Sequence, residues 1–349
     1  MLFKHTKLVV AGIGMTWRES RPSDSSLSTI CSMESNESTK GDYHVPVLLP
    51  EVLHFMAPAE GKVLVDGTLG GGGHTEAMLK TGATVIGIDQ DEQALAFARE
   101  RLAAYADRFT ALKGNFASMP QLLADAGHQQ VDGILVDIGV SSWQLDEAER
   151  GFSFAKDGPL DMRMNQSSGQ TAADLVNTAS EQELKTIFFE YGEERASNKI
   201  VRRIIERREQ KPFLTTLDLA DVIASVVPRG GKSHPATRVF QALRIAVNDE
   251  LGVLRKLLEQ SAEMLRPGGR LAVITFHSLE DRIVKQFFKK ASETHVDRKE
   301  WPEPRPNPDY HFKLLTRRPV VAGEGELKLN RRSRSAKLRV VEKIDISNA

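Results

Sequence analysis

Cysteine is nearly absent from this sequence: Cys31 is the single one among 349 residues. One cysteine excludes an internal disulfide framework and a cysteine-rich zinc site, and both absences favour a reducing, cytoplasmic location. Long apolar runs are absent as well, since no run approaches the roughly 20 residues that a membrane-spanning helix needs. The run LVVAGIGM near the start is too short and lacks a convincing cleavage site. Secretion and membrane insertion are therefore disfavoured.

Net charge is lacking too, because 47 basic side chains balance 47 acidic ones. The total charge therefore predicts no polyanionic partner. The distribution is uneven, however. Arg317–Lys343 holds nine basic residues against three acidic ones, and Arg195–Lys211 holds seven against two. Each stretch could be an ordinary solvated surface or a contact for nucleic acid, and composition leaves both interpretations open.

With 40% apolar residues, the chain can bury a core of one large domain or two ordinary ones. Residues 1–42 are rich in Ser, Thr and Glu and poor in large apolar residues. We expect them to be a disordered leader, or residues upstream of a truer start at Met33. Order is expected from residue 43 onward, where Val47, Leu48, Val52 and Phe55 recur at helical spacing.

Short apolar runs alternate with amphipathic helices over residues 43–141, which is typical of parallel strands joined by crossover helices. We expect strands at 62–66, 84–89, 109–114 and 132–139, and a helix over 91–108. Residues 142–247 show helical patterns without a convincing strand, so they are predicted to be a helical insertion.

The α/β pattern returns over 248–343 with a long helix, a Pro-Gly-Gly turn and a strand from Arg270 to Phe276. Ser278 and Asp281 have the spacing of a capping box at the start of the next helix. Residues 311–315 and 336–341 could form a final antiparallel pair of strands. We expect residues 344–349 to be a tail.

The stretch VLVDGTLGGGGHT, residues 63–75, has five glycines in seven positions, which indicates a need for backbone shape or close approach. A strand ending at Asp66, a glycine turn and a helix form the entry point of a doubly wound sheet, where ligands bind beyond the strand ends. Thr75 or Glu76 stands where the dinucleotide motif G-x-G-x-x-G needs its third glycine. Gly73 and His74 stand where a phosphate loop needs Lys and Ser or Thr. Both standard phosphate-binding loops are excluded, and an NAD-dependent oxidoreductase is disfavoured.

A ligand without phosphates suits this loop better. S-adenosylmethionine has an amino-acid tail that can lie against bare backbone, and its ribose hydroxyls suit the carboxylate of Asp89 at the end of the second strand. Phe116 could pack near the adenine, and Asp137 ends the fourth strand at the same crevice. These features favour a class I SAM-dependent methyltransferase, a Rossmann-like doubly wound α/β fold. The alternative is a tight glycine turn beside acids that only cap helices.

Longer strings extend this interpretation: HVPVLLPEVL, DGTLGGGGHT, DGILVDIGVSSWQLDEAERGFSFAKDGPLDMRM, HPATRVFQALRIAVNDEL and GGRLAVITFHSLEDRIVK. They resemble the bacterial 16S rRNA cytosine-N4 methyltransferase family of the MraW or RsmH type, from His44 to about Lys343. The resemblance implies methyl transfer from SAM to the exocyclic N4 of a cytidine in the decoding centre of 16S rRNA, within the small (30S) ribosomal subunit. No metal site and no membrane partner are expected.

The resemblance also implies site residues. Reasoning from the residues alone selects all of the cofactor contacts except His74 and Gln144, and His74 could instead satisfy backbone at a helix start. Asp137 is the best candidate to accept a hydrogen bond from the amine, whereas His277 could accept its proton or be a structural partner of its helix. Trp143 stands where proline is common in the family, which leaves the second N–H acceptor unassigned. The implied cofactor contacts are Gly72, Gly73, His74, Asp89, Phe116, Asp137 and Gln144.

A base in folded rRNA must be splayed out of its stack, so the enzyme needs flat or apolar side chains for the base and cations for the backbone. Trp143, Phe152 and Phe154 can supply the first. Asp161 and Arg163 could line the cytidine pocket, or form one ion pair that holds the insertion to the core. Arg207 and Arg208 share a broad helical side with two of the predicted RNA contacts, which are Arg163, Arg202, Arg203, Arg331, Arg332 and Arg334.

Two other classes of function stay open. A small-molecule or protein methyltransferase with this fold would dispense with the basic stretches, and its binding would be indifferent to salt. An RNA-binding assembly factor would bind the cofactor without transferring a methyl group. The sequence does not fix the oligomeric state, so monomer and homodimer both stay open.

Overall fold

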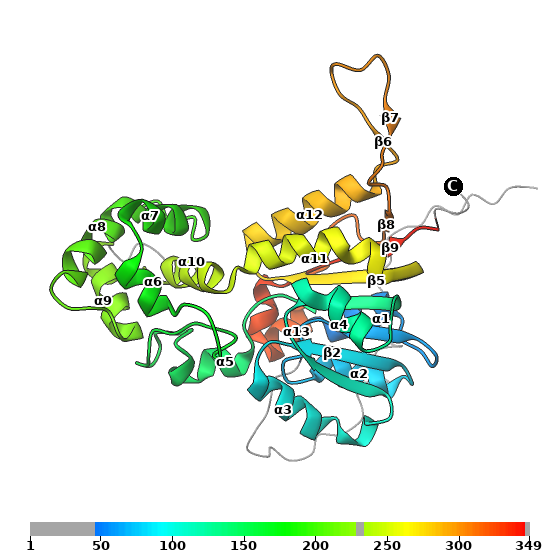
Figure 1. Ribbon diagram of the computed structural model, residues 1–349, viewed down its shortest axis with the longest axis horizontal. Helices are drawn as coiled ribbons and strands as arrows, with labels where there is room; N and C mark the ends of the chain where they lie inside the picture. The colour runs from blue at the N-terminus through cyan, green and yellow to red at the C-terminus, as the bar shows by residue number, and fades with distance from the viewer. Residues whose placement is uncertain (1–45, 228–233, 346–349) are drawn as a thin grey trace, which may run out of the picture. The chain divides into compact units, whose positions relative to one another are not determined.

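The computed structural model describes residues 46–227 and 234–345, and Figure 1 shows how their helices and strands are arranged. These described residues belong to one compact unit. The predicted leader, residues 1–42, lies outside the described residues, as do 346–349 of the predicted tail. No helix in the described ranges is long and apolar enough to cross a membrane.

A seven-stranded sheet organises the fold, in the order β3-β2-β1-β4-β5-β9-β8. Strands β1 to β5 pair in parallel, and β9 pairs antiparallel with both β5 and β8, so the predicted strands and the final antiparallel pair are confirmed. The strand order reverses between β1 and β4, the place where doubly wound sheets open a crevice for ligands. The strands are β1 Val63–Asp66, β2 Thr84–Asp89, β3 Phe109–Lys113, β4 Val131–Asp137, β5 Leu265–Thr275, β8 Phe312–Leu314 and β9 Lys337–Lys343.

Helices cover both faces of this sheet because successive strand residues point to opposite sides. Leu64 packs with α1 and α2, whereas its neighbour Val65 packs with α4, α11 and α12. Both residues are fully buried, as expected for strands covered on two faces. The prediction of a doubly wound α/β fold is therefore confirmed. The helices of this part are α1 Leu49–Met56, α2 Gly73–Lys80, α3 Glu92–Arg101, α4 Met119–Asp125, α11 Glu250–Met264, α12 Ser278–Ser292 and α13 Glu324–Leu329.

Two predicted elements differ in their bounds. The helix predicted over 91–108 ends at Arg101, because the buried Leu102 turns the chain into a short 3-10 helix, Ala103–Tyr105, ahead of β3. Strand β5 begins at Leu265 rather than Arg270. Its register against β4 jumps from Leu265 to Arg270, so the Pro-Gly-Gly turn forms a bulge inside the strand rather than a turn before it.

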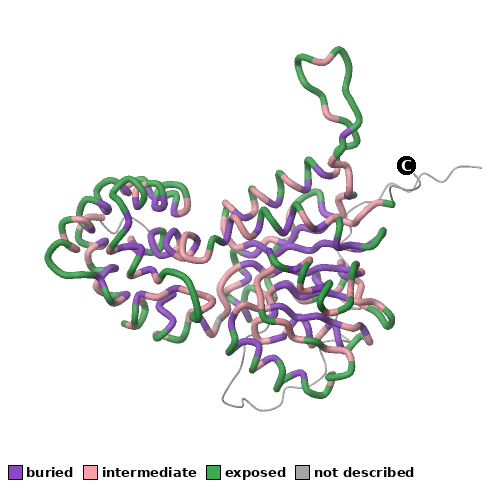
Figure 2. The backbone as a smooth tube through the Cα atoms, viewed as in Figure 1, coloured by how far each residue is buried: buried purple, intermediate pink, exposed green. Residues whose placement is uncertain are grey.

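The segment between β4 and α11 is helical, which confirms the predicted insertion. It has a hydrophobic core of its own, centred on Phe188, Phe213, Leu219 and Phe240, and Figure 2 shows buried positions inside this bundle as well as along the sheet. The exact limits of the predicted parts, 142–247 included, stay a prediction. The helices are α5 Ser142–Asp146, α6 Ala172–Thr178, α7 Glu181–Glu190, α8 Ser197–Arg208, α9 Thr216–Val226 and α10 Thr237–Asn248. Residues 294–307 form a small hairpin with β6 His295–Val296 and β7 Arg305–Pro306.

Candidate functional site

A cavity of about 200 Å³ lies beyond the carboxyl ends of β1, β2 and β4. The glycine loop forms one wall, the ends of β2 and β4 form the floor, and α11 contributes Glu250. Six of the seven cofactor residues expected from the sequence line it. Gly72 is the exception, since a Cβ there would meet Leu102 at 3.0 Å, away from the cavity. The six lining residues are Gly73, His74, Asp89, Phe116, Asp137 and Gln144.

The glycines of the loop serve shape and close approach. Gly70 has φ +48° and faces open space, where an added Cβ would meet only Thr68 O at 3.9 Å. At Gly73, the first residue of α2, a Cβ would lie 2.6 Å from Pro46 Cγ. Side chains at these positions would strain the backbone or push the 46–48 segment away. The loop therefore presents bare main chain to the cavity.

Asp89 ties this loop to the end of β2. Its Oδ2 accepts a bond from Gly70 N at 2.8 Å, and Oδ1 accepts one from Asp91 N at 2.9 Å. The pKa of Asp89 is raised to about 6, chiefly by burial; the two hydrogen bonds oppose the rise, and the charges of Asp91 and Asp66 add to it. Each carboxylate oxygen keeps a lone pair for another donor, such as a hydroxyl.

Asp137 ends β4 on the opposite side of the switch point. Its Oδ1 is buried and has no hydrogen-bond partner among the described residues. Its Oδ2 lies 4.0 Å from His74 Nδ1, and the side chain is 23% exposed. Burial raises the pKa of Asp137 to about 7, with Asp66 and Glu280 adding to the rise and His74 opposing it. A carboxylate with a free oxygen and a pKa near neutrality is suited to accepting a proton.

His74 is buried in the first turn of α2. Its Nε2 lies 2.9 Å from the carbonyl oxygen of Val47, 27 residues earlier in the chain. This contact supports the alternative in which His74 hydrogen-bonds to a backbone group. That group belongs to the segment that enters α1, however, and not to the start of the helix that carries His74. The same ring faces Asp137 through Nδ1.

Residues 42–344 match the MraW methylase family. The chain belongs to this family. It is 50% identical over 307 residues to the ribosomal RNA small subunit methyltransferase H of Carboxydothermus hydrogenoformans, covering 87% of this chain and 99% of that one. The protein of the same name from Deinococcus deserti is 51% identical over 317 residues, covering 90% and 98%.

A solved SAM-dependent O-methyltransferase from Thermotoga maritima aligns with 91% of this chain and 71% of its own, at 9% identity and a TM-score of 0.36. That likeness is too low for a comparison of sites. The resemblance to the MraW methylase family that the sequence motifs indicate is thus confirmed by the family match and the relatives.

Gln144 of this MraW methylase lines the cavity, but its amide already donates to a buried acid. Gln144 Nε2 lies 3.0 Å from Asp91 Oδ2, and Arg150 Nη1 lies 2.5 Å from the same oxygen. Arg150 Nη2 also donates to the carbonyls of Arg163 and Met164. Sequence reasoning missed Arg150, because nothing in its local pattern marks an arginine that is 2% exposed. The buried pair joins the start of α3 to the insertion.

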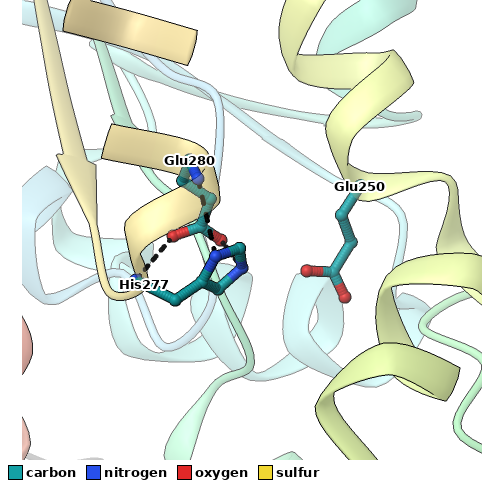
Figure 3. A group of neighbouring side chains, drawn as sticks. All are labelled: Glu250, His277 and Glu280. Atoms are coloured by element: carbon teal, nitrogen blue, oxygen red, sulfur yellow. Dashed lines mark hydrogen bonds and ion pairs between the residues drawn. The ribbon is translucent and has the colours of Figure 1, made fainter. Parts of the chain in front are cut away.

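The predicted capping box of Ser278 and Asp281 is wrong by one residue, as Figure 3 helps to show. His277 is the N-cap of α12, and Glu280 Oε2 accepts bonds from the backbone N–H groups of Phe276 and His277. Asp281 is instead held by Arg339 at 2.7 Å, and the Ser278 hydroxyl donates to a glutamate of the insertion. Because Ser278 and Asp281 are engaged by these partners, His277 and Glu280 form the capping box instead.

His277 therefore contacts its own helix rather than the cavity. Its Nε2 lies 2.8 Å from Glu280 Oε1, and the cavity lining includes Phe276 but not His277. This geometry supports the structural alternative over the role of proton acceptor. Glu250, His277 and Glu280 offer ligand atoms within 4.8 Å of one another (Figure 3). Both oxygens of Glu250 already accept bonds from Arg244, at 2.8 Å each.

The aromatic residues expected around the target base do not line the cavity. Phe152 is buried in the core of the insertion, and Phe154 packs against Phe240 with ring centroids 4.7 Å apart. These two phenylalanines pack against apolar neighbours in the insertion, whereas the role expected of Trp143 stays a prediction. Trp143 lies beside Arg150, whose guanidinium carbon is 5.2 Å from its ring centre.

The six predicted RNA-binding arginines lie in three different surroundings. Arg163 forms a two-pronged ion pair with Asp161, with contacts of 2.9 and 2.8 Å, which leaves the pair outside the cavity lining. Arg332 lines the cavity and donates to Asp146 at 3.2 Å. The other four side chains are exposed: Arg202, Arg203, Arg331 and Arg334.

Arg207 and Arg208 do not share a free face with Arg202 and Arg203. Arg207 holds both oxygens of Asp218, and Arg208 donates to the carbonyls of residues 176 and 179. Both arginines therefore bond to partners within the helical bundle. Residues on one broad side of a helix pack against different neighbours, and those neighbours decide which side chains stay exposed. The expectation of a four-arginine surface on α8 is wrong.

Proposed function

We propose that this chain methylates the exocyclic N4 of a specific cytidine in the decoding centre of 16S rRNA, with SAM as the methyl donor, acting in the cytoplasm on the small (30S) ribosomal subunit. Family membership and half-identity to proteins named ribosomal RNA small subunit methyltransferase H support this reaction. The observation that carries it is the free, buried oxygen of Asp137 at the cavity formed by the glycine loop.

The residues of the cavity fit SAM. The loop and the N-terminus of α2 offer backbone N–H groups to the carboxylate of the amino-acid tail. Asp89 has lone pairs for the ribose hydroxyls, and Phe116 offers an apolar ring for the adenine. Asp89 and Asp137 line the cavity and favour a cationic ligand, whereas the charge of Glu250 is paired with Arg244. When bound, SAM supplies an electrophilic methyl group.

The chain's own task is to place and deprotonate the amine. The N4 lone pair is conjugated with the ring, so the amine is a poor nucleophile. Holding it in line with the methyl carbon can be worth roughly 7 to 11 kcal/mol. The Asp137 carboxylate lines the cavity with a side chain that is 23% exposed, so it can accept one N–H of the amine and then its proton.

The reaction is expected to speed up as the pH rises through neutrality. Asp137 has a raised pKa of about 7, so it is protonated and unable to accept the amine proton below that value. The single-turnover rate should fall about tenfold for each pH unit below the pKa and level off above it. Measuring that rate at saturating SAM between about pH 5.5 and pH 8.5 tests the prediction. A flat profile would contradict it.

The exposed arginines should contribute to RNA affinity. We expect Arg202→Gln with Arg203→Gln to weaken binding to small subunits and to lower the slope of log affinity against log salt by roughly 1 to 2. A matched control replaces two exposed lysines of α12 and the 294–307 hairpin, Lys285→Gln with Lys299→Gln. Equal losses in both double variants would mean that only net charge matters and would contradict a specific contact.

One experiment tests the proposed function as a whole. The protein is incubated with labelled SAM and small subunits from a strain that lacks the enzyme, and the labelled nucleotide is mapped. We expect N4-methylcytidine at a single position of the decoding centre. Label on protein or on many nucleotides would refute the proposal. Cofactor binding without transfer would instead support an assembly factor.

A further inference from the structure

Arg332 reaches the cavity from the short 3-10 helix Arg331–Ser335, which follows α13. Its Nη1 is buried and has no hydrogen-bond partner among the described residues. The guanidinium of Arg101, which also lines the cavity, is bonded to Glu76 and to the Gly71 carbonyl. A buried N–H without an acceptor is uncommon in native structures, and it indicates an acceptor that the chain itself does not supply. Of these two arginines, Arg332 is therefore the one with a donor to offer a ligand.

Two sets of contacts hold Arg332 beside the cavity. Its Nη2 donates to Asp146 Oδ2, at the end of α5, across 3.2 Å. The segment that carries Arg332 is fixed to the core through Glu326, whose Oε1 accepts bonds from Leu48 N and from the Ser333 hydroxyl. Asp146 is 65% exposed, so its ion pair with Arg332 is weak and a stronger anion can compete with it. The backbone position is thus fixed, while the charge of the guanidinium stays available.

We propose that Arg332 binds a backbone phosphate next to the target cytidine, on its 5′ or its 3′ side, when the base enters the cavity. This inference rests on the proposed function. A flipped base enters the pocket while its phosphates stay at the mouth. The Arg332 side chain matches that division, because it lines the cavity and is 32% exposed. A guanidinium can bond two oxygens of one phosphate, so it fixes the orientation of the nucleotide as well as its position.

The carboxylate of SAM is the competing anion for Arg332. Backbone N–H groups of the glycine loop and of the first turn of α2 already suit that carboxylate. Arg331 and Arg334 lie in the same short 3-10 helix as Arg332, and both are exposed. The positive charge therefore continues from the cavity onto the surface. A chain of phosphates is matched by such a row of cations, whereas a single carboxylate is not, so the charge distribution favours the RNA backbone.

Arg332→Gln removes the charge and keeps a polar side chain. We expect kcat/KM for small subunits to fall by about 10-fold to 100-fold, the usual effect of losing one charge-assisted hydrogen bond. The slope of log affinity against log salt should fall by about 1. Arg331→Gln is the matched control, because Arg331 is the adjacent exposed arginine and does not line the cavity. The control should lose far less, and equal losses in the two variants would overturn the proposal.

Titration of SAM separates the two anions. If Arg332 binds a phosphate, the loss of SAM affinity in Arg332→Gln, measured by calorimetry, should be far smaller than the loss of affinity for small subunits. A loss of equal size would assign Arg332 to the carboxylate of SAM and overturn the proposal. Arg332→Lys keeps the charge without the planar guanidinium, so it should restore the salt dependence and part of kcat/KM. A thermal unfolding curve shows whether each variant is folded.

A nucleotide titration covers the case in which Arg332→Gln folds poorly, since it begins with the original protein. Cytidine 5′-monophosphate or cytidine 3′-monophosphate should bind about tenfold or more tightly than cytidine, because only the nucleotides carry a phosphate. Equal affinities for cytidine and both nucleotides would overturn the proposal. Failure of the original protein to methylate small subunits would overturn the proposed function instead, and the nucleotide titration would still decide whether Arg332 has a phosphate to bind.

Discussion

Asp137→Asn should bind SAM but lose methyl transfer by about a hundredfold to ten-thousandfold, the usual contribution of a positioned proton acceptor. Asparagine has the shape of aspartate and can still accept a hydrogen bond from the amine. It cannot take the proton, because its amide does not protonate near neutral pH. The buried Oδ1 of Asp137 has no other partner within the described residues, so the substitution breaks no hydrogen bond of that atom.

The measurement is a single-turnover rate with labelled SAM, alongside calorimetric titration of SAM and a thermal unfolding curve. Asp132→Asn is a matched control on the same strand. Asp132 is also 23% exposed, but it lies at the other end of β4, where it contacts Val63 N and Arg266. Equal rates in Asp137→Asn and the original protein would remove Asp137 from the chemistry.

Arg150→Met should lower the free energy of unfolding by about 3 to 5 kcal/mol, the cost of leaving one partner of a buried ion pair alone. Arg150 and Asp91 have side chains that are 2% and 6% exposed, with 2.5 Å between Nη1 and Oδ2. Methionine fills a similar volume without charge. Asp91 would keep Gln144 as its only side-chain donor in the described structure, and the carbonyls of Arg163 and Met164 would lose theirs.

Urea unfolding followed by circular dichroism measures this loss. Arg203→Met is the control, because Arg203 pairs with Glu206 at 3.5 Å on the surface, with side chains about half exposed. The control should change stability by less than about 1 kcal/mol. A loss of the same small size in Arg150→Met would show that the pair with Asp91 contributes little to joining the insertion to the core.

Local sequence patterns were enough to predict the sheet and the glycine loop. Strands such as 84–89 are continuous apolar runs because helices cover both of their faces. Such a run consists of adjacent residues, so it can be recognised in the sequence. The ends of parallel strands meet at one edge of a sheet, so Asp89 and Asp137 could be placed at a common crevice before any coordinates. The same reasoning identified Gly73 and Phe116, both of which line the cavity.

Local patterns failed where a distant partner decides the role of a side chain. Asp281 has the right spacing for a cap, yet Arg339, 58 residues away, takes it. Arg207 has the right helical position for RNA, yet Asp218 of the next helix holds it.

The sequence alone determined the fold class, the glycine loop and the acids at the strand ends, because each depends on the residues beside it in the chain. Only the tertiary structure decided which polar side chains are free. Asp137 keeps an oxygen without a partner among the described residues, whereas Arg150 and Arg208 are engaged by groups far away in sequence. Most buried polar groups bond to a partner that the fold brings close, and that partner can lie anywhere in the chain. The spacing of residues in the sequence therefore does not identify it.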